Sequence, residues 1–150
     1  MNNNPINLIG LKLGYKTTNT NEKAMEDCGA LWQEYLGSFV PSKIPNKISS
    51  DTYAVYFDYD GDYTDPYAYF IGCAVEPGTE VPAGLDSITI PVQKYEVVTA
   101  KGKMPDCVAN AWRDIWKSDI ERAYGFDFEV YSEKSADWNN AEVDIYLSVK

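Results

Sequence analysis

The order of structural signals repeats once along this chain, and this duplication restricts the fold more than any other feature. Apolar runs, helical spacing and turn residues predict the same four elements in each half: strand, helix, strand and strand. They span residues 6–17, 22–39, 52–59 and 67–75 in the first half, and 85–100, 106–117, 127–133 and 142–149 in the second. The sequence therefore predicts an α+β fold built as a pseudo-twofold duplication of a strand-helix-strand-strand module.

One short motif recurs between the halves, although their residue identity is low. Residues 53–56 read Tyr-Ala-Val-Tyr and residues 128–131 read Phe-Glu-Val-Tyr, so Glu129 stands where the first half has Ala54. The linker of residues 76–84 contains prolines and glycines and joins repeat halves of about 1–78 and 84–150. We expect the halves to form one domain, residues 1–150, because this length and a 45% hydrophobic content suit a single core.

The composition excludes several classes of function. A net charge of −10 disfavours direct nucleic-acid binding, which depends on clustered Lys and Arg. No apolar run approaches the about 18 residues of a membrane span, and the start of the chain lacks a targeting signal, so we expect a cytoplasmic protein. Histidine is absent, which removes Ser-His-Asp and Cys-His catalysis, histidine-ligated haem and His-containing zinc sites.

No metal or cofactor is expected. Cys28, Cys73 and Cys107 are widely spaced and lack a Cys-x-x-Cys pair, so they are interpreted as small buried apolar residues. The acidic segment of residues 58–65 superficially suggests a calcium loop. It lacks the glycine and glutamate that an EF-hand needs at its sixth and twelfth positions, so a hairpin turn is the better interpretation.

Both predicted helices carry an aromatic stripe. In the first, Cys28, Trp32 and Tyr35 recur at helical spacing, with Thr20 or Asn21 as the candidate cap. In the second, which opens at Pro105 and Asp106, Trp112 and Trp116 stand four residues apart. Such stripes usually cover a sheet, but paired tryptophans also form ligand walls, because flat rings offer contact area at little entropic cost.

Strand alternation places Glu129 and Tyr131 on one face of the sheet, and Tyr56 shares a face with Ala54 in the equivalent strand. Tyr146 of the last strand is a candidate for the same face. A carboxylate among aromatic rings indicates a pocket for a cationic or polarisable molecule. The alternative is that Glu129 is solvated on an open sheet face, because burying a carboxylate is costly unless it is paired.

The chain resembles the GyrI-like, or AraC-type effector-binding, domain family. The resemblance rests on Trp-x-x-x-Trp at residues 112–116, Asp-Phe-Glu-Val-Tyr at 127–131 and Ala-Glu-Val-Asp-Ile-Tyr-Leu at 141–147. Residues 53–59, the acidic turn and Gly72 extend it over nearly the whole chain. The resemblance implies two strand-helix-strand-strand modules, an antiparallel sheet with two main helices and a drug-binding groove between the modules.

The resemblance also implies a site. In members that sense lipophilic cations, the matching glutamate lies deep in the groove among aromatic rings, which makes Glu129 the expected central ligand-binding residue. The candidate lining consists of aromatic residues on the helices and central strands, namely Trp32, Tyr35, Tyr56, Trp112, Trp116, Tyr131 and Tyr146.

Three functions remain open on this basis. The leading hypothesis is non-enzymatic binding of amphipathic, cationic aromatic compounds. Members are often fused to a DNA-binding domain, whereas here the effector-binding unit fills the chain, so we expect a standalone sensor, a drug-sequestering protein or a component acting through a partner such as a DNA-binding regulator. The second hypothesis is a hydrolase of reactive cyclopropane-type natural products, with Glu129 as general base and Tyr56 or Tyr131 as acid partner. The third is a protein-interaction module like the family's gyrase inhibitors.

Overall fold

A single antiparallel sheet with helices on one face forms the protein. The computed structural model describes residues 5–19, 23–62, 64–104 and 106–150. Its elements are β1 (Ile6–Lys12), α1 (Lys23–Gly37), α2 (Val40–Lys43), β2 (Thr52–Phe57), β3 (Ala68–Val75), β4 (Asp86–Ile90), β5 (Lys94–Gly102), α3 (Asp106–Trp116), β6 (Asp127–Tyr131), the 3-10 helix η2 (Glu133–Ser135) and β7 (Ala141–Val149). The expected first residue of the first helix, residue 22, its candidate caps Thr20 and Asn21, and Pro105 lie outside the described residues.

The sheet order confirms the duplicated α+β fold. The seven strands are ordered β4-β1-β3-β2-β6-β7-β5, so β1-β3-β2 of the first module is matched by β5-β7-β6 of the second. The modules join where β2 pairs with β6, and Ala54 lies directly opposite Glu129. Tyr53 pairs with Val130 and Val55 with Phe128. The pseudo-twofold axis therefore passes between Ala54 and Glu129.

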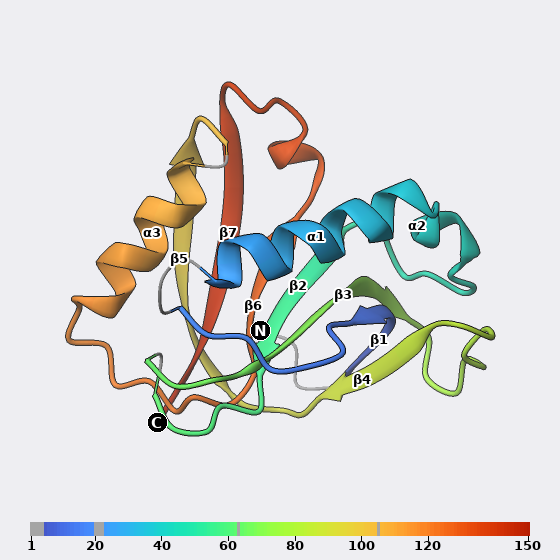
Figure 1. Cartoon of the computed structure of the whole chain (residues 1–150), viewed down its shortest axis with the longest axis horizontal. Helices are drawn as coiled ribbons and strands as arrows, with labels where there is room; N and C mark the ends of the chain where they lie inside the picture. Colours follow the sequence, from blue (N-terminus) through green and yellow to red (C-terminus); the bar gives the residue numbers. More distant parts are fainter. Residues whose placement is uncertain (1–4, 20–22, 63, 105) are drawn as a thin grey trace.

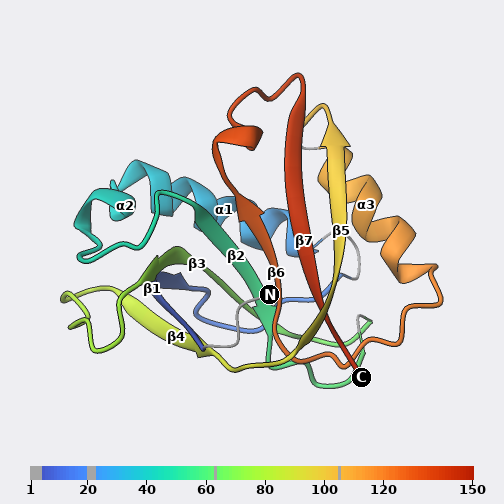
Figure 2. The same ribbon diagram turned by 180° about the vertical axis from the view of Figure 1, so that it is seen from behind.

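The prediction of a single strand over residues 85–100 is wrong. The structure divides it into β4, which pairs with β1, and β5, which pairs with β7 at the opposite edge of the sheet (Figures 1 and 2). Pro91 lies at the break, and proline has no N–H to donate to a continuing ladder. β4 therefore stands outside the repeat and extends the sheet of the first module.

Other expected boundaries shift by a few residues. The first strand ends at Lys12, although Thr17 still forms an isolated bridge with Tyr67. β6 ends at Tyr131, before η2. The acidic segment joins the antiparallel β2 and β3, which confirms the hairpin turn. Over the described ranges, no group of three or more His, Cys, Asp or Glu residues could hold a metal, and no helix is long and apolar enough to cross a membrane.

Helices α1 and α3 lie on the same face of the sheet, and the strands lie in front when the molecule is seen from behind (Figures 1 and 2). α1 buries Leu31 and Tyr35 against β1 and β3, in a cluster that includes Cys73. Cys28 and Cys107 are only half-buried, so the expectation that all three cysteines are buried holds for Cys73 alone.

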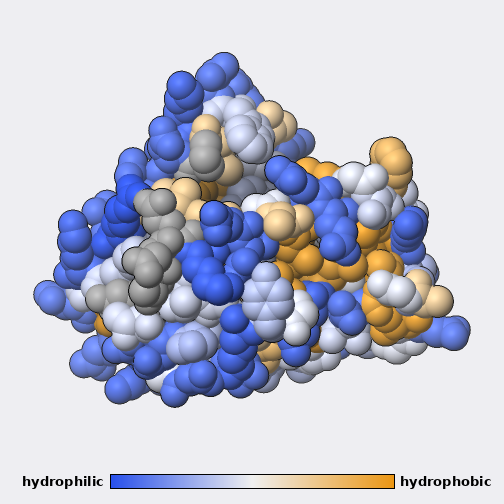
Figure 3. Space-filling model, viewed as in Figure 1, coloured by the Kyte–Doolittle hydropathy of each residue, from blue (hydrophilic) through white to orange (hydrophobic). Residues whose placement is uncertain are grey.

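α3 covers the second module with a stripe at helical spacing. Val108, Trp112 and Ile115 are buried against Val143 and Ile145 of β7. The opposite face of the sheet has its own core around Phe70 and Phe128 of the central strands, so the helices are not needed to bury it. Apolar side chains are also exposed at the C-terminal end of α1 and just after it, among them Leu36 and Phe39. Apolar surface is visible over this end of the molecule in Figure 3.

A pair of glycines lets β1 and β3 approach closely, and both glycines lie on the face of the sheet opposite α1. Gly10 and Gly72 are cross-strand partners. A Cβ atom at Gly10 would lie 2.5 Å from the Cα atom of Gly72, and one at Gly72 would lie 2.6 Å from the Phe70 ring. Neither position therefore has room for a side chain, because backbone of a central ladder would have to move.

We expect Gly10→Ala to lower the free energy of unfolding by about 1–3 kcal/mol, which is typical of overpacking in a well-packed core. Gly14→Ala is the matched control, because a Cβ atom there would meet no atom within 4 Å. Urea denaturation of the two variants measures the difference. Equal stability of both variants would contradict the close approach of the strands.

Candidate ligand-binding site

A cavity of about 390 Å³ lies on the helix side of the sheet, between α1 and α3. Both modules contribute to it. Its floor is formed by residues of β2, β3 and β6, and its walls by the two helices and the segments next to them. The lining consists of Asn19, Ala24, Met25, Cys28, Gly29, Trp32, Tyr56, Tyr59, Tyr67, Tyr69, Met104, Val108, Ala109, Trp112, Arg113, Trp116, Arg122, Glu129 and Tyr131.

Glu129 lies in the floor of this cavity and is 2% exposed. Its Oε2 atom accepts hydrogen bonds from the Tyr56 hydroxyl at 2.9 Å and from Nε1 of Trp112 at 2.5 Å. Its Oε1 atom accepts one from the Tyr131 hydroxyl at 2.5 Å. The carboxylate is thus fixed by donors from β2, α3 and β6, which orient it but carry no charge.

Two opposing effects act on the protonation of Glu129. Burial disfavours the charged form, and the hydrogen bonds from Tyr131, Trp112 and Tyr56 favour it. Burial is the larger effect, so the pKa of Glu129 lies above its ordinary value. Burial and the nearby Glu129 also raise the pKa of both Tyr56 and Tyr131 well above the usual range, so these phenols stay protonated and remain donors.

Glu129 has no cationic partner among the ion pairs of the described residues. The neighbouring Asp127 differs in this respect, because it forms a buried ion pair with Arg122 at 2.8 Å. Buried carboxylates are normally paired, since removing the charge from water is unfavourable. The arrangement therefore leaves a negative charge at the cavity floor that a positive group could compensate.

The aromatic walls are packed against one another. The Trp32 and Tyr131 rings have centroids 5.1 Å apart in an edge-to-face arrangement, and Tyr56 and Trp112 have the same separation. Nε1 of Trp32 donates to the Tyr69 hydroxyl at 2.8 Å. These contacts fix the rings around the cavity in the geometry preferred by aromatic pairs.

The structure brings six of the eight sequence-predicted residues to the cavity: Trp32, Tyr56, Trp112, Trp116, Glu129 and Tyr131. Tyr35 is absent from the lining. It is fully buried behind Trp32, where its hydroxyl contacts Sγ of Cys73 at 3.3 Å. It supports the wall and does not face the cavity.

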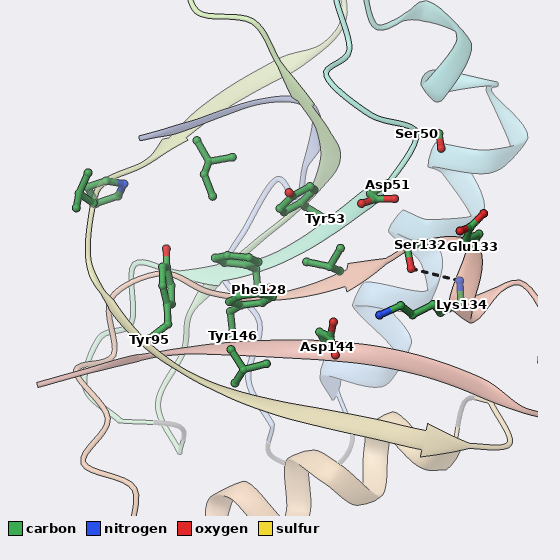
Figure 4. A pocket seen from close by; sticks show the side chains of 15 residues that line it. Ser50, Asp51, Tyr53, Tyr95, Phe128, Ser132, Glu133, Lys134, Asp144 and Tyr146 are labelled. Atoms are coloured by element: carbon green, nitrogen blue, oxygen red, sulfur yellow. Dashed lines mark hydrogen bonds between the residues drawn. The ribbon is translucent and has the colours of Figure 1, made fainter. Parts of the chain in front are cut away.

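The placement of Tyr146 on the Glu129 face is wrong. The β6–β7 register pairs Glu129 with Ile145 and Phe128 with Tyr146, and directly paired residues point to the same face. Tyr146 consequently stacks on Phe128 on the opposite face, with ring centroids 4.9 Å apart (Figure 4). Those rings line a separate hollow of about 900 Å³, with Tyr53 and Tyr95 beside them (Figure 4).

Sequence reasoning missed several lining residues. Tyr69 lies on the helix side of β3 with Ile71, and alternation within that strand could have identified it. Tyr59 and Tyr67 belong to the expected strands 52–59 and 67–75, but in the structure they lie just beyond the ends of β2 and β3, next to the acidic turn. Arg122 comes from the irregular segment between α3 and β6, where no sequence pattern predicts which way a side chain points.

Comparisons with known proteins are consistent with this architecture. A family model described as integron-associated effector binding protein matches residues 2–149. The chain is similar to YobU of Bacillus subtilis (strain 168), which carries the name of a transcriptional regulator, with 26% identity over 123 residues that cover 80% of this chain and 75% of YobU.

Two solved structures have the same fold. The integron cassette protein VCH_CASS2 of Vibrio cholerae has a TM-score of 0.75 and 26% identity, over 98% of this chain and 92% of that chain. SAV2435 bound to tetraphenylphosphonium has a TM-score of 0.77 and 17% identity, over 98% and 90% of the two chains. With nearly its whole length matched by the family model, the chain belongs to the family of integron-associated effector binding proteins, a GyrI-like family.

Proposed function

We propose that the cavity binds an amphipathic, cationic aromatic molecule, whose positive charge is compensated by Glu129 and whose rings pack between Trp and Tyr side chains. The observation that carries this proposal is a buried carboxylate, held by three neutral donors and without a cationic partner in the described residues, at the floor of an aromatic cavity. A cavity of about 390 Å³ falls within the size range of small-molecule sites.

The surroundings of Glu129 favour a lipophilic cation over a small hydrated ion. Trp32, Trp112 and Trp116 line the cavity, and aromatic faces attract cations. Glu129 is the single carboxylate of the described lining, whereas an inorganic divalent cation normally takes six or more oxygen ligands or keeps its hydrating water. An aromatic cation can bury its rings and bring its charge to Glu129 at the same time.

The relatives support a sensing role. SAV2435, which has the same fold, has been observed with tetraphenylphosphonium, an aromatic cation. YobU carries the name of a transcriptional regulator. On this basis the ligand-bound protein acts as a sensor or sequesters the compound, and in the sensor role it acts through a partner such as a DNA-binding regulator.

We expect Glu129→Gln to weaken tetraphenylphosphonium binding by at least about tenfold, or about 1.4 kcal/mol, because the substitution removes the compensating charge and keeps the side-chain volume. Triphenylphosphine oxide, a neutral molecule of related shape, should change by less than about threefold. Isothermal titration calorimetry measures both affinities.

Glu96→Gln is the matched control for this experiment. Glu96 is exposed on β5 and lies outside the cavity lining, so its substitution changes the net charge equally without altering the site. Equal losses for the cation and the neutral molecule in Glu129→Gln, or equal losses in the two variants, would argue against charge compensation by Glu129.

The affinity for tetraphenylphosphonium should also fall as the pH is lowered. Protonation neutralises Glu129, and its raised pKa places this loss at a higher pH than an ordinary glutamate would give. Among the described lining residues, Glu129 is the single carboxyl group, and the probe itself does not titrate. Affinities measured between pH 8 and pH 4.5 should decline for the unaltered protein and stay flat for Glu129→Gln.

One observation supports the hydrolase as a second candidate. Glu129 is hydrogen-bonded to the protonated Tyr131 and Tyr56, so a base and candidate acids stand together at the cavity. In this reaction Glu129 would remove a proton from water as it attacks the strained ring, and a tyrosine would protonate the opened carbon. Turnover of an electrophilic cyclopropane compound, lost in Glu129→Gln, would favour the hydrolase, and the absence of turnover would leave binding as the function of the site.

A further inference from the structure

Besides Glu129, the described lining contains two charged residues, Arg113 and Arg122. Arg113 is exposed, whereas Arg122 is buried. Arg122 lies in the segment between α3 and β6 and forms an isolated bridge with Val149. It is 6% exposed, yet it contributes to the cavity lining beside Trp112. Burial opposes its charge, but the attraction of Asp127 and Tyr59 prevails and raises the pKa of Arg122, so the guanidinium stays charged.

The hydrogen bonds of Arg122 are incomplete. Its Nη2 atom donates to Oδ2 of Asp127 at 2.8 Å, whereas the buried Nε and Nη1 atoms have no partner among the described residues. A buried charged donor without an acceptor is unfavourable, and native structures rarely contain one without a functional reason. Two such donors on a single side chain are therefore a specific feature of this cavity.

The neighbours of Arg122 do not satisfy these donors. Asp127 is already the acceptor for the Tyr59 hydroxyl and for the backbone N–H and hydroxyl of Ser148. The Tyr124 and Trp112 rings contact the guanidinium at 4.4 Å and 5.7 Å from Cζ, but ring contacts satisfy the face of a guanidinium and not its N–H edge. The Nε and Nη1 donors thus remain without an acceptor, and a ligand oxygen that reaches the guanidinium from the cavity would supply one.

We propose that Arg122 forms an acceptor-binding subsite of the cavity, so that the preferred ligands carry an oxygen acceptor, best a carboxylate, in addition to a cationic aromatic group. This inference rests on the proposed function, because it assigns a second contact to the same ligand. Glu129 takes the positive group and Arg122 takes the oxygen, with Trp112 between them in contact with both. A carboxylate is the strongest acceptor for such a donor, because the hydrogen bond is charge-assisted at both ends.

The test uses two phosphonium probes that differ at one end. (4-Carboxybutyl)triphenylphosphonium and pentyltriphenylphosphonium have the same cationic head and the same chain length, but the first ends in a carboxylate and the second in a methyl group. We expect the unaltered protein to prefer the carboxylate probe by at least about tenfold, and Arg122→Met to bind the two probes with affinities within about threefold of each other. Calorimetric titration measures both affinities.

Arg122→Lys guards against a folding defect, because lysine keeps a cation for Asp127 but carries all its donors on one atom, away from the positions of Nε and Nη1. It should likewise lose most of the preference. An unaltered protein that binds both probes equally, or a preference that survives in both variants, would overturn the acceptor subsite and leave the role of Glu129 intact. Binding of neither probe by the unaltered protein would refute the proposed function and this inference together.

Discussion

The cavity depends on one buried carboxylate that neutral groups hold in place. Tyr56, Trp112 and Tyr131 direct three hydrogen bonds to Glu129 from three different elements, so the same contacts that orient the charge also join β2, α3 and β6. These donors stabilise the carboxylate without neutralising it. The contrast with Asp127, whose charge Arg122 compensates, shows that the fold can pair a buried acid and does so next to the cavity.

The pseudo-twofold sheet explains why only one of the two equivalent positions, 54 and 129, carries a glutamate. Ala54 and Glu129 occupy equivalent positions and face each other across the central β2–β6 ladder. Side chains paired in this way have Cβ atoms about 5 Å apart, so glutamate at both positions would place two buried like charges side by side. Alanine on one side avoids this repulsion, and the symmetric scaffold carries an asymmetric site.

Much of the fold and part of the site could be predicted from the sequence. Helical spacing and strand alternation act locally, so they identified both modules, the face shared by Glu129 and Tyr131, and the helix stripe that carries Trp112. The break at Pro91 was missed because both β4 and β5 are strand-like, and only pairing partners separate them. Tyr146 was misplaced because alternation defines faces within a strand, whereas the register between strands decides which faces coincide.

By itself, the sequence determined the duplication and placed Glu129 among aromatic residues, because these are properties of neighbouring residues and of recurring short motifs. Only the tertiary structure decided that Glu129 is buried, which donors reach it, that Tyr35 lies behind the wall and that Arg122 borders the cavity. The reason is physical. Burial and hydrogen bonding depend on residues from distant segments, and their convergence is fixed by strand register and helix packing, which local periodicity does not encode.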